Sequence, residues 1–200
     1  MNTIKTEKLD VRDFITIGIF AAISLVIFFV IGGAAGMTLV GTVANIPITV
    51  FFTSIAYMLL VSKVRKKGTF LIMGTISALP GLMAANVIGV IASILGWIIA
   101  EVVASANHYK SKAVLIFAYV LGCTLHSAGY TLPMYLSNAQ YLIDRQDILH
   151  LTDEALAVYL KMFTWPMFFS MVALTIVTSF LGAFISTRIL KKHFEKAGLL

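Results

Sequence analysis

No Asp, Glu, Lys or Arg occurs between Ala113 and Ile143, and this uncharged run constrains the fold more than any other feature of the sequence. A helix needs roughly 20 apolar residues to cross a bilayer, so the run is long enough to span one. The whole chain is 60% hydrophobic and 12% charged, with a mean hydropathy of +0.96. A soluble globule cannot cover its surface with so few polar groups. We therefore predict an all-α integral membrane protein, with residues 1–200 forming a single transmembrane domain.

The positions of the basic residues predict the topology. Of the 15 Lys and Arg, only Arg145 and Lys161 fall outside segments that we assign to the cytoplasm. Short cytoplasmic loops carry an excess of Lys and Arg, so this bias predicts six spans with both termini cytoplasmic. The net charge of +6 is then a topology signal rather than a sign of nucleic-acid binding. The predicted spans are residues 14–31, 45–62, 69–79, 87–105, 113–136 and 162–187.

The segments between the spans carry their own signals. Asp10 is an expected N-cap of the first helix, which is too long for the core of a signal peptide. The glycine-rich residues 32–41 predict an outer loop without stable helix, either a flap over a pocket or a plain flexible turn. Residues 137–160 form the largest hydrophilic loop, and a short surface helix is expected to start near Thr152. Glu101, near a cytoplasmic helix end, is expected to be an interfacial or partner-contacting carboxylate rather than a transported-ion site.

His126 is the residue in the long uncharged run that most needs an explanation. On a helix it shares one face with Cys123, Tyr130 and Pro133, so that face is polar at membrane depth. Ionisable groups at this depth usually face a cavity or a partner and indicate a functional site. The alternative is a packing histidine that is hydrogen-bonded to a neighbouring helix.

The sequence contains no motif for binding a nucleotide that could power transport, and no hydrolase motif. It has no Walker-type glycine loop, no H-E-x-x-H and no G-x-S-x-G. We therefore expect that the protein is not an enzyme. The weaker alternative is an intramembrane enzyme that uses His126 as its general base. The single cysteine, Cys123, excludes an internal disulfide and a cysteine zinc cage.

Several stretches resemble the substrate-binding S components of energy-coupling factor (ECF) transporters, and most closely the branch typified by Treponema and Streptococcus proteins. These stretches are residues 9–22, the turn at 63–68, and Ala100-Glu101 before the turn at 109–111. The resemblance implies a bundle of the S-component kind in the membrane of a bacterial cell. It also implies that the chain captures a micronutrient outside and docks on a transmembrane coupling subunit (T component) with two ATPase subunits. The docking surface would be the small residues Gly18, Ala21 and Ala22, for which internal packing is an equal alternative from spacing alone.

The resemblance places the substrate in the outer half of the helices, under the loops at 32–41 and 137–160. The expected lining residues are His126, Tyr130, Tyr135, Asn86, Asn45, Trp165 and Met167. Haem or a related tetrapyrrole is the most specific candidate, since His126 could bind iron, with His150 as a second ligand, and Arg145 and Lys161 could hold the propionates. A smaller vitamin-like or aromatic compound is the alternative, and a metal ion is a weaker one. No cofactor of the protein's own is expected.

Overall fold

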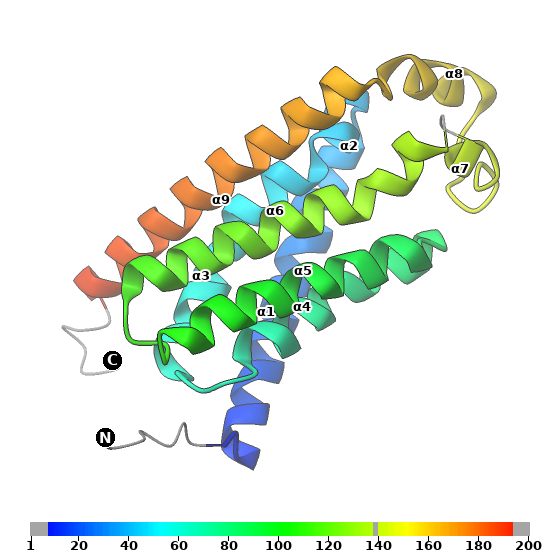
Figure 1. Cartoon of the computed structure of the whole chain (residues 1–200). Helices are drawn as coiled ribbons and strands as arrows, with labels where there is room; N and C mark the ends of the chain where they lie inside the picture. Colours follow the sequence, from blue (N-terminus) through cyan, green and yellow to red (C-terminus); the bar gives the residue numbers. More distant parts are fainter. Residues whose placement is uncertain (1–7, 138–139, 194–200) are drawn as a thin grey trace.

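The structure is a computed structural model that describes residues 8–137 and 140–193, and within those residues every regular element is helical. The chain forms its elements in the order shown in Figure 1. They are α1 (Val11–Gly36), α2 (Leu39–Val43), α3 (Asn45–Lys63), α4 (Thr69–Ala78), the 3₁₀ helix η1 (Leu79–Ala84), α5 (Val87–Ala106), α6 (Lys112–Leu136), α7 (Gln140–Ile143), α8 (Asp153–Met162) and α9 (Trp165–His193).

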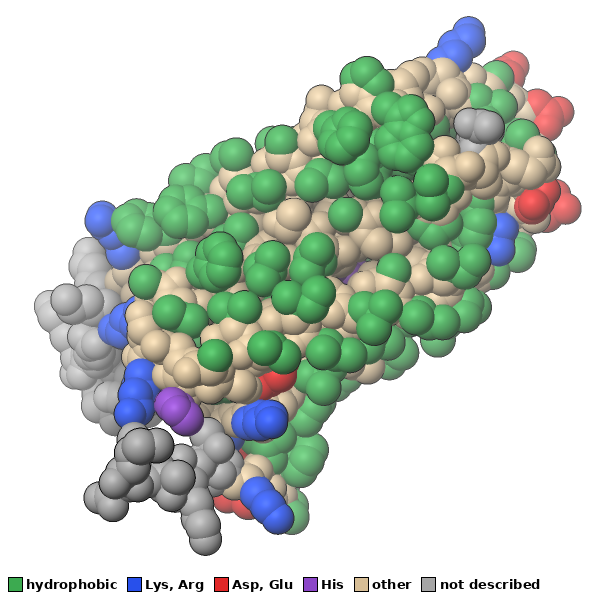
Figure 2. Space-filling view, viewed as in Figure 1, with side chains coloured by type: hydrophobic (Ala, Val, Ile, Leu, Met, Phe, Trp, Pro, Cys, Tyr) green, Lys and Arg blue, Asp and Glu red, His purple; other side chains and the backbone are tan. Residues whose placement is uncertain are grey.

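In the described part of the chain, five helices are long and apolar enough to cross a membrane: α1, α3, α5, α6 and α9. The remaining predicted span corresponds to α4 and η1, a shorter apolar segment over Thr69–Ala84. At about 1.5 Å per α-helical residue and about 2 Å per 3₁₀ residue, this segment is roughly 27 Å long. Apolar side chains cover most of the flank in Figure 2, and charged side chains lie near its two ends. This distribution is what a bilayer requires of a multi-pass protein.

The long helices form a bundle in which α1 occupies one side. Helix α5 packs mainly against α6, while α9 packs against α3 and α6. Helix α1 contacts α3 and α4 and runs across the other long helices rather than along them (Figure 1). Only 17% of its most apolar window is buried, which leaves most of α1 facing outward. Small polar residues connect the helices, as in the contact of 3.0 Å between the hydroxyl oxygens of Ser54 and Ser186.

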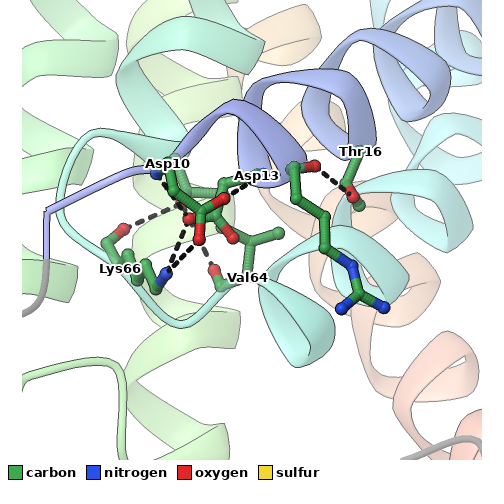
Figure 3. A network of polar contacts seen from close by, with 7 residues as sticks. Asp10, Asp13, Thr16, Val64 and Lys66 are labelled. Carbon is green, nitrogen blue, oxygen red and sulfur yellow. Dashed lines mark hydrogen bonds and ion pairs between the residues drawn. The ribbon is translucent and has the colours of Figure 1, made fainter.

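The start of α1 is fixed to the loop between α3 and α4. Asp10 and Asp13 form a capping box, in which each carboxylate accepts the backbone N–H of the other residue at 2.9 Å. Lys66 Nζ lies 2.7 Å from Asp13 Oδ2 and 3.6 Å from Asp10 Oδ2 (Figure 3). The expected N-cap at Asp10 is therefore present, and an ion pair joins it to the next cytoplasmic loop that we predicted.

Glu101 differs from the expected partner-contacting carboxylate, because it is only 5% exposed and its bonds lie within the chain. Its Oε1 accepts the backbone N–H of Gly68 at 2.9 Å, and its Oε2 accepts that of Phe70 at 3.0 Å. Gly68, at φ 101°, is the N-cap of α4 and offers no side-chain acceptor, so Glu101 replaces the missing cap. The Ser105 and Tyr109 hydroxyls also donate to this carboxylate. Burial and the neighbouring carboxylate raise the pKa of Tyr109, which keeps that hydroxyl a donor.

The opposite end of the bundle, which we call the α8 end, differs in one respect from the sequence prediction. Helix α1 continues to Gly36, and Thr38 then caps α2, so only two residues of the expected loop at 32–41 are not helical. Glycine weakens a helix by only about 1 kcal/mol, and the absence of water in a bilayer makes unpaired backbone groups more costly than that. The short helix expected near Thr152 is α8, which Thr152 caps. Its Leu156 and Tyr159 form a small second core with Leu142.

Candidate functional site

A small cavity lies where α1, α3, α4, α5 and α6 meet, and its volume is about 50 Å³. By distance along α6, His126 in its wall is roughly 20 Å from Lys112, at the depth of a membrane interior. The described residues in the wall include no Asp, Glu, Lys or Arg. The lining residues are Ser24, Leu25, Phe28, Ile46, Thr49, Val50, Thr53, Tyr57, Ser77, Trp97, Tyr119, Cys123 and His126.

Several hydroxyl groups in the cavity wall have already donated their protons within the protein. Tyr57 donates to Ser77 Oγ at 2.8 Å, and Tyr119 donates to the carbonyl oxygen of Val50 at 2.6 Å. Thr49 donates to the carbonyl oxygen of Asn45 at 2.9 Å. Each of these hydroxyl oxygens keeps acceptor capacity. These three hydroxyl groups can therefore offer a ligand only acceptors.

Two nitrogen atoms of residues in the cavity wall have no hydrogen-bond partner among the residues that the structure describes. They are Trp97 Nε1 and His126 Nδ1, and both atoms are buried. Trp97 is itself only 2% exposed, and its ring centroid lies 6.4 Å from that of His126. Buried polar atoms in native proteins are nearly always paired, so this pair of nitrogens points to a missing partner.

Trp97 is held in a slot between two other helices. A Cβ added to Gly74 of α4 or to Gly122 of α6 would lie 2.1 Å and 2.4 Å, respectively, from atoms of the indole ring. Tyr57 stacks on the indole, with ring centroids 5.2 Å apart. The indole is therefore fixed by its packing, which presents its N–H group in one orientation.

Rings continue from Trp97 toward both ends of the bundle. Toward Glu101, Phe70 and then Tyr109 follow, at centroid separations of 6.4 Å and 6.0 Å. Toward the α8 end, His126 and then Tyr130 follow, at 6.4 Å and 5.7 Å. We call these five residues the aromatic column. The aromatic column therefore leads from the cavity wall to Tyr109, whose hydroxyl donates to Glu101.

Of the residues predicted to bind substrate, His126 lines the cavity and Tyr130 lies beside it. Asn86 is fully buried at the α8 end and caps α5. Its Nδ2 donates to the carbonyl oxygen of Tyr130 at 2.8 Å, and its Oδ1 accepts the Tyr141 hydroxyl at 2.8 Å. Arg145 lies 3.5 Å from the Tyr141 ring centroid and donates to the carbonyl oxygen of Ala85 at 3.3 Å. Asn86 and Arg145 thus fasten the α7 segment to the start of α5.

The remaining predicted residues lie elsewhere. Tyr135 and Trp165 belong to an aromatic cluster with Phe163 and Phe168. Asn45 donates to the carbonyl oxygen of Gly32 at 2.8 Å, which ties α3 to α1. Met167 is partly buried, and His150 and Lys161 are exposed. The structure therefore does not bring the predicted set together around one pocket.

The predicted docking residues divide between two faces of α1. Ala21 is only 2% exposed and packs inside the bundle. Gly18 and Ala22 face outward, and a Cβ added to Gly18 would meet nothing within 4 Å. The alternative of internal packing thus applies to Ala21, whereas Gly18 and Ala22 lie on an open face.

Sequence reasoning missed Trp97, Tyr57 and Tyr119, which form much of the cavity wall. The available signal was the pair Gly74 and Gly122, which leave room for a large ring only if their helices face each other. No group of three or more His, Cys, Asp or Glu that could hold a metal occurs in the part of the chain that the structure describes.

Residues 11–196 fit the profile of a family described as hypothetical bacterial integral membrane protein (Trep_Strep). No curated protein and no solved structure matches the chain. The match covers nearly the whole sequence and agrees with the long apolar helices described above. The chain therefore belongs to the Trep_Strep family and is a multi-pass integral membrane protein of bacteria.

Proposed function

We propose that this protein is the substrate-binding membrane subunit of an importer of the ECF kind. It captures a small organic micronutrient at the outer face and depends on a T component and two separate ATPase subunits for transport. The observation that carries this proposal is the uncharged cavity at membrane depth, in which Trp97 Nε1 and His126 Nδ1 lack partners. Buried polar atoms without a partner in the protein are expected at a binding site, because a ligand completes their hydrogen bonds.

The open face of α1 supports a partner subunit. Gly18 and Ala22 are one helical turn apart, and both are exposed. Small residues at this spacing let a second helix approach closely in a membrane. Helix α1 also lies on only one side of the bundle, so a partner can reach this face without displacing other helices (Figure 1).

Six crossings with both termini cytoplasmic complete the proposal. Five crossings come from the long helices, and the sixth is the segment Thr69–Ala84, whose length of roughly 27 Å approaches the bilayer core of about 30 Å. In this orientation the Glu101 end is cytoplasmic and the α8 end is outside. Lys66, Lys110 and Arg188 then lie inside, in agreement with the positive-inside rule.

Between the two substrates considered, the geometry favours the smaller compound over a tetrapyrrole. Pockets for drug-sized ligands measure about 300–1,000 Å³, so haem would require the helices around this cavity of about 50 Å³ to separate widely. Arg145 is also engaged with Ala85 and Tyr141, and His150 and Lys161 are exposed and outside the cavity wall. Haem remains testable, because protein from haem-supplied cells would show a Soret band that His126→Ala shifts or abolishes.

Co-purification and uptake test the proposed function. The tagged chain should retain a T component and two ATPases when it is extracted in mild detergent. Gly18→Leu and Ala22→Leu should reduce both co-purification and uptake, because added bulk keeps helices apart. Ala34→Leu is the matched control for Ala22→Leu, since it makes the same change at another exposed position of α1. Normal transport by the Gly18 and Ala22 variants would rule out this docking face.

An enzyme that uses His126 as a general base is the alternative of another class. That base would need an acidic or nucleophilic partner, and the cavity wall offers hydroxyls and the Cys123 thiol but no carboxylate. Turnover of a substrate by the isolated chain, lost in His126→Ala, would favour this alternative over the importer.

A further inference from the structure

We infer that the part of the ligand that enters this cavity is an uncharged amide-type group, meaning a carboxamide, a ureido group or the equivalent edge of a small ring. This inference rests on the proposed function and adds the chemical class of the substrate. It is drawn from two unpaired nitrogens, the charge of the wall and the size of the cavity.

The two nitrogens supply a donor and an acceptor from rings of the cavity wall whose centroids lie 6.4 Å apart. An indole N–H can only donate, so Trp97 Nε1 requires an acceptor from the ligand. His126 Nδ1 accepts when the imidazole proton is on Nε2, and it then requires a donor. An amide presents a carbonyl oxygen and an N–H on adjacent atoms. The carbonyl would accept from Trp97, and the N–H would donate to His126.

The wall selects against anions. Its described residues carry no Lys or Arg, and the Tyr57, Tyr119 and Thr49 hydroxyls have already donated their protons. A carboxylate or phosphate would therefore meet neutral donors, among them the Trp97 N–H and the Ser24 and Ser77 hydroxyls, but no cation of the described wall. Burial of an ion that lacks its counter-charge is costly, whereas a neutral amide can use both the donors and the acceptors.

The size of the cavity limits the group. A volume of about 50 Å³ holds roughly three to five water-sized groups, by the usual allowance of about 10–15 Å³ for each. A carboxamide has three non-hydrogen atoms and a ureido group has four. The rest of a larger ligand would extend beyond the cavity.

An NMR titration of the indole N–H tests this inference. Trp165→Phe leaves Trp97 as the single tryptophan, since the chain contains 2 Trp. The full-length variant in detergent is labelled with ¹⁵N at the indole and titrated at neutral pH with propionamide and with propionate, its anionic analogue of equal size. Propionamide should move the Trp97 signal downfield to saturation at millimolar concentration, and propionate should leave it in place.

Two further variants assign the acceptor. His126→Leu should weaken propionamide binding about three- to tenfold, as expected for the loss of one hydrogen bond, whereas His126→Gln keeps an acceptor and should stay within about threefold. An equal response to propionate, or no response to either probe, would overturn the amide assignment. Neither result would affect co-purification with the T component, so the failure of this inference and of the proposed function can be told apart.

Discussion

Replacement of Glu101 by Gln should destabilise the protein strongly although it changes one atom. In the native structure Oε1 accepts from Gly68 N–H and Oε2 accepts from Phe70 N–H, Leu71 N–H and the Tyr109 hydroxyl. In Gln one of these oxygens becomes an NH₂ group, which cannot accept. Either orientation of the amide therefore leaves at least one backbone N–H at the start of α4, that of Gly68 or those of Phe70 and Leu71, facing a donor.

The magnitude follows from the number of groups affected. A buried donor left without an acceptor costs about 1–3 kcal/mol, and the hydrogen bonds that remain lose their charge assistance. We expect a loss of about 2–4 kcal/mol in the free energy of unfolding. For a chain of 200 residues, this corresponds to a decrease in Tm of roughly 5–15 °C.

Thermal unfolding in detergent, followed by circular dichroism, measures this effect. Ser105→Ala is the matched control, because it removes one hydroxyl from the same carboxylate and leaves the backbone donors paired. It should lower Tm by no more than a few degrees. If Glu101→Gln unfolds within about 2 °C of the wild type, the assignment of Glu101 as the cap of α4 is wrong.

Three further predictions concern packing, the α8 end and pH. Gly74→Ala should reduce the free energy of unfolding by about 1–3 kcal/mol, because the new Cβ meets the Trp97 ring. Gly18→Ala has open space around it and should be neutral or slightly stabilising in the same thermal unfolding experiment. Asn86→Ala should lower Tm through the loss of its three hydrogen bonds and increase hydrogen exchange at the start of α5. The backbone N–H donated to Asp10, aided by Lys66, lowers the pKa of that carboxyl, so its capping of α1 should persist at neutral pH. This cap should be lost as pH falls below about 4, and the loss would be measured as faster hydrogen exchange of the backbone N–H groups at the start of α1.

The positions of the helices could be predicted from sequence because the bilayer restricts the choices. The predicted span at 113–136 corresponds to α6 at Lys112–Leu136, and the span at 45–62 corresponds to α3 at Asn45–Lys63. Charge and apolar run length determine these boundaries locally. The prediction of a loop at 32–41 was wrong. It gave more weight to the glycine content than to the need for paired backbone groups at membrane depth.

The cavity could be predicted only in part, because it depends on contacts between distant segments. His126 could be identified from the sequence because it is an ionisable residue within a long run without Asp, Glu, Lys or Arg. Its neighbour Trp97 comes from another helix, and the packing of Gly74 and Gly122 against the indole holds the two rings at a centroid distance of 6.4 Å. Asn86 and Arg145 look like ligand-binding residues in the sequence, yet the structure uses them to join α7 to α5.

Mass spectrometry of the compound bound to the purified protein tests the central claim most directly. The chain is extracted from its native membrane, and small molecules released from the wild type are compared with those from His126→Leu and from the control Ala34→Leu. We predict one uncharged compound with an amide-type group that is retained by the wild type and by Ala34→Leu and is lost or strongly depleted in His126→Leu. Equal retention of that compound by all three proteins, or an anionic compound in its place, would contradict the account.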